Sequence, residues 1–293
     1  MPESGKPRLP GDRGHLQRLV NARATSAGVP PARVQGWLNA MVVAAVLDRV
    51  RDEDDEPIFL LKGGVAMELR LKLRARTTKD YDAAFRARAD EVLDLLDEAL
   101  QGTYNNFAVT RDAPEAIRDT GAMRVRLRLA YKGRDWGSVK LELAPVEGKM
   151  GSELDRVEAA PVDGLQVPVL DKVSCVSVRY QVAQKLHACT EVFEVGPEND
   201  RFRDVMDILL VEDLIRGEVG LLRSREACID IFEVRGKHTW PPEVTVYESW
   251  REPYRKLAAE NDFQPEDIDA AATTLRELIA NIDAAGQSTP NAA

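Results

Sequence analysis

Two aspartates separated by one residue, Asp80 and Asp82, lie in a short stretch with the pattern of a β-strand. Side chains two residues apart on a strand leave the same face, so both carboxylates point to one side. This pairing suits a divalent cation, because Mg²⁺ is usually bound by one or two carboxylates together with substrate phosphates. Upstream, Gly63 and Gly64 precede a helical pattern, where a glycine turn can bring backbone N–H groups close to a phosphate. Together the two motifs predict a site for Mg²⁺ and a nucleoside triphosphate.

A third carboxylate would complete a site for two metal ions, and Glu142 is the best candidate. It alternates with aliphatic residues in Lys140-Leu141-Glu142, which places it on the strand face opposite the core. The plain alternative is an exposed acid paired with Lys140. We expect Glu142 to bind metal together with Asp80 and Asp82.

Charged residues also cluster in helical patterns further along the chain. Lys185 lies beside a stripe of apolar residues at helical spacing, near the edge of a buried face. Asp200, Asp204 and Asp207 fall within one narrow arc of the following helix. Three carboxylates at this spacing repel one another unless cations neutralise them, and Arg203, Lys185 or a metal ion could do so. The alternative is a solvated helix face.

Basic residues are concentrated in two stretches of a chain whose net charge is −9. Residues 70–88 contain seven Lys or Arg against two Asp, and residues 123–134 contain five and no acid. In the second stretch arginine alternates strictly with aliphatic residues, so one strand face carries only arginine. Basic stretches on an acidic protein favour a phosphate-bearing partner at one surface, whereas the alternative is that solvated faces simply carry arginine.

The composition excludes several classes of protein. With 44% hydrophobic and 30% charged residues, the chain has the balance of a folded, soluble protein. No apolar run is long enough to span a bilayer, and the N-terminus lacks the apolar stretch of a secretory signal. The three cysteines are widely spaced and the three histidines are scattered, so neither a disulfide framework nor a zinc site is expected. We therefore expect a cytoplasmic protein that does not contact a membrane.

The hydrophobic pattern divides the chain into a mixed half and a helical half. Strand signals stop near residue 145, and a loop to about residue 171 leads into helices. This favours an α+β N-terminal lobe over residues 1–160 and a helical lobe over 161–293, with residues 1–13 disordered. The expected helices cover about residues 15–27, 32–52, 65–73, 89–101, 178–193, 201–216, 223–235 and 266–284, and the expected strands cover 81–85, 124–129 and 138–143, the last two as a hairpin.

Four motifs in order give the chain a specific resemblance. They are Leu61-Lys62-Gly63-Gly64, Arg76-Thr77-Thr78-Lys79-Asp80-Tyr81-Asp82, Gln184-Lys185-Leu186-His187-Ala188 and Arg201-x-Arg203-Asp204-x-x-Asp207. This set resembles the AbiEii/MenT nucleotidyltransferase-like toxins of bacterial toxin–antitoxin systems over most of the chain, and residues 228–244 look most like the mycobacterial MenT branch. The resemblance implies a bilobed polymerase-beta-type nucleotidyltransferase fold. It also implies Mg²⁺-dependent transfer of a nucleoside monophosphate from NTP to the 3′ acceptor end of tRNA, which blocks aminoacylation and translation, and a cognate antitoxin as partner.

The resemblance also assigns roles to single residues. Asp80 and Asp82 match the family's metal-binding pair. Lys185 matches its essential lysine and Asp207 its final essential aspartate. After Gly-Gly the family usually has Ser or Thr, whereas Val65 offers no hydroxyl, so the grip on phosphate must rest more on backbone N–H groups. The residues expected in catalysis are Asp80, Lys185 and Asp207, and those expected to bind the nucleotide are Lys62, Gly63, Gly64 and Lys185.

An RNA substrate would give the basic stretches a role. We expect the RNA backbone to contact Arg74, Arg76, Arg124, Arg126 and Arg128. Two other functions stay open: transfer to a hydroxyl of a small molecule or protein by the same fold, and a non-catalytic nucleotide- or RNA-binding regulator. The sequence does not decide which NTP is used, which tRNAs are modified or whether the chain dimerises.

Two threonines, Thr77 and Thr78, precede the aspartate pair. The plain interpretation is that they lead into the strand. A sharper hypothesis is regulation by phosphorylation, because a phosphate there would add about −1.5 to −2 charge beside the metal site and oppose NTP binding. A partner antitoxin could act in this way.

Overall fold

The structure, a computed structural model, describes residues 8–72, 78, 80–117, 121–216 and 220–285. The chain divides into two compact units: the sheet unit comprises Met1–Lys72, Thr77–Val146 and Leu154–Cys175, and the helical unit comprises the remainder. The sequence placed the boundary at residue 160. Residues 161–175 instead belong to the sheet unit, because strand β9 (Lys172–Val176) pairs with strand β1 (Phe59–Lys62).

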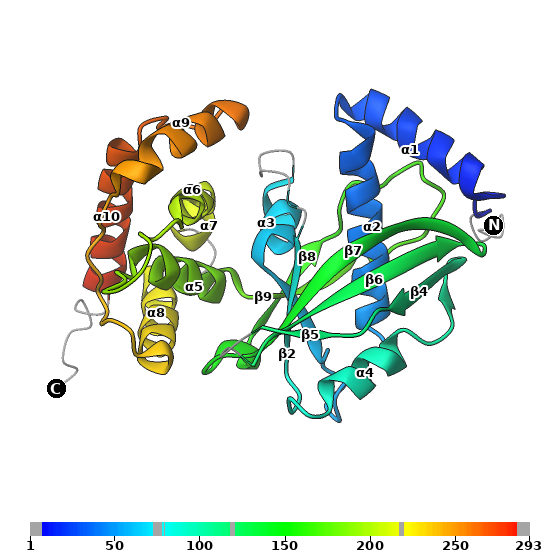
Figure 1. The fold of residues 1–293 in the computed structure, drawn as a ribbon, viewed down its shortest axis with the longest axis horizontal. Helices are drawn as coiled ribbons and strands as arrows, with labels where there is room; N and C mark the ends of the chain where they lie inside the picture. Colours follow the sequence, from blue (N-terminus) through cyan, green and yellow to red (C-terminus); the bar gives the residue numbers. More distant parts are fainter. Residues whose placement is uncertain (1–7, 73–77, 79, 118–120, 217–219, 286–293) are drawn as a thin grey trace, which may run out of the picture. The chain divides into compact units, whose positions relative to one another are not determined.

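A mixed sheet forms the centre of the sheet unit (Figure 1). Its other strands are β2 (Asp80–Phe85), β3 (Thr103–Tyr104), β4 (Phe107–Arg111), β5 (Glu115–Ala116), β6 (Met123–Tyr131), β7 (Arg134–Pro145) and β8 (Leu154–Glu158). The order is β3-β4-β6-β7-β2-β1-β9-β8, with β5 pairing to β6. β2 runs parallel to β7 and antiparallel to β1, so the strand that carries the aspartate pair lies in the middle of the sheet.

The predicted hairpin is confirmed, since β6 and β7 pair in antiparallel fashion. Strand alternation buries the aliphatic side chains of β6 and leaves its three arginines exposed on the opposite face. In register, Glu142 of β7 lies between Asp82 of β2 and Arg124 of β6. The pleat therefore gathers the charged side chains of three strands on one face of the sheet.

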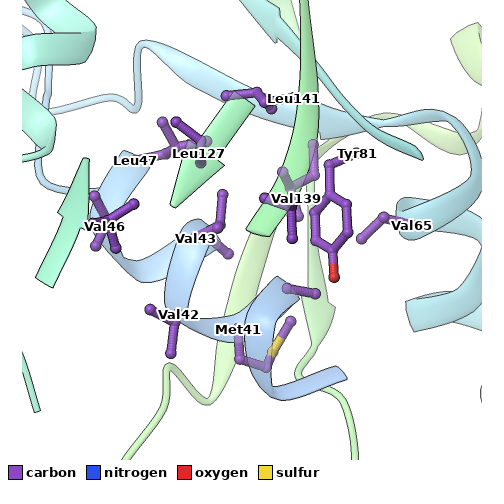
Figure 2. Close-up of a cluster of buried hydrophobic side chains, with 14 of the residues drawn as sticks. Met41, Val42, Val43, Val46, Leu47, Val65, Tyr81, Leu127, Val139 and Leu141 are labelled. Carbon is purple, nitrogen blue, oxygen red and sulfur yellow. The ribbon is translucent and has the colours of Figure 1, made fainter. Parts of the chain in front are cut away.

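The core covers the other face and is built on helix α2 (Pro31–Leu47), which is buried over most of its length. Figure 2 shows Met41, Val43 and Leu47 of α2 beside Leu127 and Val139 of the hairpin. The polar groups that the helix brings into this core are paired. The indole of Trp136 donates to Asn39 Oδ1 at 2.9 Å, and Tyr81 Oη donates to the Gly36 carbonyl at 2.7 Å. Pairing of this kind removes most of the penalty for burying polar atoms.

Two expectations about the sheet unit were wrong. Residues 8–13 are not disordered: Asp12 caps helix α1 (Arg13–Ala27), and Tyr131 Oη donates to the Pro10 carbonyl at 2.8 Å. The strands also do not end near residue 145, contrary to the prediction from the sequence pattern, because β8 and β9 follow. The sheet unit is completed by helices α3 (Gly63–Leu71) and α4 (Val92–Ala99).

The helical unit is built on α5 (Val178–Thr190), which packs against α6 (Phe202–Leu210) and α8 (Leu221–Arg235). Helix α10 (Ile268–Ala284) packs against α6 and α8, and α9 (Arg251–Glu260) against α6 (Figure 1). The helix expected over 201–216 is interrupted and continues as the short α7 (Glu212–Leu214), and α9 was not predicted. Within the described ranges, no helix is both long and apolar enough to cross a bilayer.

Candidate functional site

The glycine turn lies directly against the second aspartate of the pair. Helix α3 begins at Gly63, whose φ of +61° is a left-handed conformation that side chains rarely adopt. A Cβ at this position would lie 2.0 Å from Asp82 Oδ2, so only glycine lets the carboxylate approach the turn this closely. The register agrees, since Lys62 of β1 lies opposite Asp82 of β2. The structure therefore brings the two predicted motifs together.

The second glycine makes room for a threonine hydroxyl. A Cβ on Gly64 would lie 2.6 Å from Thr78 Oγ1, and this hydroxyl donates to the Asp80 carbonyl at 3.3 Å. Lys62, the N-cap of α3, makes no capping hydrogen bond with its side chain. The first N–H groups of a helix lack intrahelical partners and carry the positive end of its dipole. The start of α3 thus offers donors for a phosphate next to a hydroxyl and a carboxylate.

The three predicted metal ligands lie on one face of the sheet but differ in their surroundings. Asp80 is exposed, whereas Asp82 and Glu142 are partly buried on neighbouring strands. Glu142 accepts from Arg124 at 3.1 Å, so its partner comes from the adjacent strand rather than from Lys140. Among the residues that the structure describes, no three His, Cys, Asp or Glu side chains form a group that could hold a metal ion. The aspartate pair fits Mg²⁺, which needs only one or two carboxylates when a triphosphate supplies further oxygens.

The arginines of β6 lie on one exposed strand face, as predicted, but nearby acids offset much of their positive charge. Arg128 donates to both carboxylate oxygens of Asp112, at 2.7 and 2.8 Å, and these hydrogen bonds hold the pKa of Asp112 below its usual value. Arg126 lies 3.9 Å from the same carboxylate, and Arg124 pairs with Glu142. The three arginines share two acids, so the face keeps a smaller excess of positive charge than the sequence suggests. Arg74, Arg76 and Thr77 lie outside the described residues.

In the helical unit, one lysine holds two aspartates. Lys185 Nζ on α5 donates to Asp204 Oδ1 at 2.6 Å and to Asp207 Oδ2 at 2.8 Å, both on α6. Only 13% of the Lys185 side chain is exposed, and the two aspartate side chains are exposed by 10% and 3%. Of the cations that could neutralise the acidic arc, the structure selects Lys185. Asp200 is exposed and precedes α6, and the Arg203 guanidinium lies over the ring of Phe202.

The protonation state of this group follows from its charges. Burial by itself lowers the pKa of Lys185, but the charges of Asp207 and Asp204 outweigh it and raise the pKa above its ordinary value. Lys185 is therefore an ammonium at neutral pH and a hydrogen-bond donor, not a general base. Asp204 was missing from the sites predicted from sequence, although its spacing of three residues from Asp207 placed both on one helix face.

A second polar cluster in the helical unit is made of uncharged histidines. The His187 ring is buried against Phe232 and His238, at centroid distances of 4.9 and 4.4 Å. Burial lowers the pKa of His187 to about 4, and neither ring nitrogen has a hydrogen-bond partner among the described residues. Thr190 Oγ1 donates to the Leu186 carbonyl at 2.6 Å, so it accepts from His238 Nε2 at 2.9 Å. His187 is thus a packing residue of the helical core.

The mixed sheet, its central acids and its glycine turn define a nucleotidyltransferase-type fold. A structure search finds MenT4, a nucleotidyltransferase toxin from Mycobacterium tuberculosis, with a TM-score of 0.53 and 18% sequence identity; the match covers 92% of this chain and 89% of that one. The family model described as "Nucleotidyl transferase AbiEii toxin, Type IV TA system" matches residues 45–281. The chain therefore belongs to the AbiEii family and is a nucleotidyltransferase of the toxin type. No curated protein gives a significant sequence match.

Proposed function

We propose that the protein transfers a nucleoside monophosphate from an NTP to the 3′ acceptor end of tRNA in a Mg²⁺-dependent reaction. The observation that carries the proposal is the contact between the glycine turn and the aspartate pair, where a Cβ on Gly63 would meet Asp82 Oδ2 at 2.0 Å. This contact puts the first N–H groups of α3 beside the Asp82 carboxylate. Such an arrangement can hold the phosphates of an NTP and the cation that accompanies them.

The triphosphate is held by backbone and hydroxyl groups. Val65 is buried in the core near Tyr81 (Figure 2), so the side chain that follows Gly-Gly is turned away from any ligand at the helix start. The N–H groups of the first turn of α3 and the hydroxyl of Thr78 take over that task. Lys62, opposite Asp82 in the register, adds a positive charge on the same face.

Asp80 and Asp82 would hold Mg²⁺, which would supply positive charge to offset the phosphate charge and to make the attacking hydroxyl more acidic. Glu142 contributes a further carboxylate once Arg124 releases it. In the helical unit, Lys185 offers a fixed donor for an anionic ligand, since an ammonium has three N–H groups and Asp204 and Asp207 accept from two of them. Asp207 keeps this ammonium protonated and in place.

The proposal is tested with radiolabelled NTPs, Mg²⁺ and total tRNA. Label should enter RNA, and Asp80→Ala should reduce the rate by roughly 10²–10³, the equivalent of several kcal/mol of lost charge stabilisation. Asp90→Ala is the matched control, because Asp90 is an exposed aspartate of the same unit whose ion-pair partner, within the described part of the chain, is the nearby Arg88. No labelling by the unmodified protein, or full labelling by Asp80→Ala, would sink the proposal.

The acceptor is identified by where the label appears. Label at RNA 3′ ends, read by sequencing the ends of the treated RNA, supports tRNA as the substrate. Label on a small molecule or on protein would instead support the same chemistry with another acceptor. Binding of NTP or RNA without any transfer would indicate a regulator.

We also propose that phosphorylation of Thr78 by a partner antitoxin switches the enzyme off. Thr78 Oγ1 lies against Gly64 at the start of α3, so a phosphate on this oxygen would occupy the place of the NTP phosphate. Thr78→Glu should abolish labelling, whereas Thr78→Ser, which keeps the hydroxyl, should retain it. Full activity of Thr78→Glu would contradict the proposal. Thr77 is the neighbouring candidate and is tested by Thr77→Glu.

A further inference from the structure

The start of α5 collects polar groups that are buried without partners. Ser177 and Gln181 are 4% and 2% exposed, and within the described part of the chain neither the Ser177 hydroxyl nor either atom of the Gln181 amide has a hydrogen-bond partner. Arg179 lies between them in sequence, and its Nε is also buried without a hydrogen-bond partner among the described residues. A buried polar group without a partner costs about 1–3 kcal/mol, so such groups at a single helix end call for a function.

The groups belong to the N-cap and the first turns of a thirteen-residue helix. Ser177 is the N-cap and has the extended backbone of one, but its side chain makes no capping hydrogen bond. Gln181 follows one turn later, and because Cα–Cβ bonds tilt toward the N-terminus of a helix, its amide covers the turn that begins at Ser177. The helix dipole adds positive potential at this point.

One anion already borders the cluster. Arg179 forms an ion pair with Glu153, a residue of the same unit whose side chain is 52% exposed. Arg179 thus ties the start of α5 to a carboxylate at the surface. Guanidinium groups bind phosphate as well as carboxylate, so an incoming phosphate can replace Glu153 on Arg179.

We propose that the N-terminus of α5 is a phosphoryl-binding site formed by Ser177, Arg179 and Gln181, with Glu153 as the competing internal anion. The hydroxyl, the guanidinium Nε–H and the amide N–H supply donors for phosphate oxygens, as the helix end does. The phosphate belongs either to the triphosphate of the NTP or to the RNA backbone. The proposal deepens the proposed function and rests on it for the source of the phosphate, but not for phosphate binding itself.

The test measures pyrophosphate affinity by calorimetry and stability by thermal unfolding, on the full chain. In Gln181→Leu the melting temperature should rise, because an unpartnered amide is removed, while the dissociation constant for pyrophosphate rises about tenfold. Ser177→Ala should weaken binding in the same direction without loss of stability. Glu153→Gln should bind pyrophosphate more tightly, since it removes the competing charge.

Thr190→Val is the matched control on the same helix. Its hydroxyl is buried but fully paired, so this variant should melt earlier and bind pyrophosphate as the unmodified protein does. Unchanged pyrophosphate affinity in Gln181→Leu and Ser177→Ala overturns the inference. A lower melting temperature in both variants does the same, because it would mean that the groups are partnered inside the fold.

Two further measurements on Gln181→Leu, the KM for NTP and the affinity for tRNA, distinguish the two sources of the phosphate. A raised KM for NTP with unchanged tRNA affinity assigns the site to the triphosphate, and the reverse result assigns it to the RNA backbone. If the unmodified protein binds pyrophosphate through these residues but transfers no label, the site stands and the proposed function fails. If it transfers label and the variants bind pyrophosphate normally, the proposed function stands and this inference fails.

Discussion

Carboxylates in the two units of this protein have opposite environments. Asp204 and Asp207 of the helical unit are buried, and one ammonium donates hydrogen bonds to both. Asp80 and Asp82 of the sheet unit lie on a polar sheet face, exposed and partly buried respectively, next to a helix start. The helical unit therefore pairs its buried carboxylates within the fold. The sheet unit keeps the Asp80 carboxylate exposed, where we propose that a cation binds.

The comparison shows that spacing alone does not distinguish an acid paired within the fold from one that is open to solvent. Both pairs have the separation that puts side chains on one face of their element, two residues on a strand and three on a helix. Burial makes the difference, because a buried charge must be paired within the fold whereas an exposed one is stabilised by water until a ligand arrives.

The largest effect on stability is expected when the buried group loses its cation. Lys185→Met should lower the free energy of unfolding by about 3–5 kcal/mol, since two buried carboxylates would lose their ammonium. Asp80→Ala, on the exposed pair, should change it by no more than about 0.5 kcal/mol. Urea unfolding of both variants measures the two changes in the free energy of unfolding. Equal losses would contradict the difference between the buried and the exposed carboxylates.

Replacing the whole buried group sharpens this result. The combined variant Lys185→Met, Asp204→Leu, Asp207→Leu removes all three charges together and should recover most of the stability lost by Lys185→Met alone. It should nevertheless transfer no label, because the donor is gone. Recovered activity would show that the group serves only the fold.

A smaller effect is expected from acid. His187 has a pKa of about 4 in the folded protein, against about 6.5 when unfolded, so between these pH values the unfolded chain binds a proton that the folded chain does not. The free energy of unfolding should therefore fall as the pH drops from 6.5 to 4, by about 3 kcal/mol from this residue. His187→Leu should remove that part of the pH dependence and leave stability above pH 7 nearly unchanged. Parallel curves for the two proteins would contradict the assignment.

Next in size is the effect of a methyl group at the glycine turn. Gly63→Ala should cost about 1–3 kcal/mol and reduce labelling, because the new Cβ meets both a left-handed backbone and the Asp82 carboxylate. Gly102→Ala is the matched control, since Gly102 also has a positive φ but no atom within 4 Å of a new Cβ. Equal stability losses in the two variants would mean that the contact with Asp82 adds nothing.

The smallest effect is expected on the arginine face. Arg126→Gln should weaken tRNA binding modestly and reduce the slope of log affinity against log salt by about 1, the contribution of one phosphate contact. Arg88→Gln is the control, since Arg88 is an exposed arginine of the same unit away from β6. An unchanged slope in Arg126→Gln would exclude this face from RNA binding.

Local patterns explain which parts of the fold could be predicted. The alternation of arginine and aliphatic residues on β6 predicted both the strand and its exposed face, because one face of that strand is solvated. β9 gave no such signal, since four of its five residues are buried and it follows a long irregular segment. The missed boundary at residue 160 has the same cause.

The candidate site was predicted residue by residue, but its pairings were not. The sequence suggested Lys140 as the alternative ion-pair partner of Glu142. In the structure the partner is Arg124, which lies opposite Glu142 on β6. The sequence offered three cations for the acidic arc, and the structure gives Lys185 to Asp204 and Asp207. Each of these partners comes from another strand or helix.

By itself, the sequence determined the helices and strands with clear periodicity, the aspartate pair on one strand face and the resemblance that the family match confirms. These depend on residues a few positions apart, whose relative directions the backbone geometry sets. Tertiary structure alone decided that Asp82 lies against Gly63 and that Lys185 pairs with two carboxylates. Those contacts join residues 19 or more positions apart, and sheet register and helix packing bring them together.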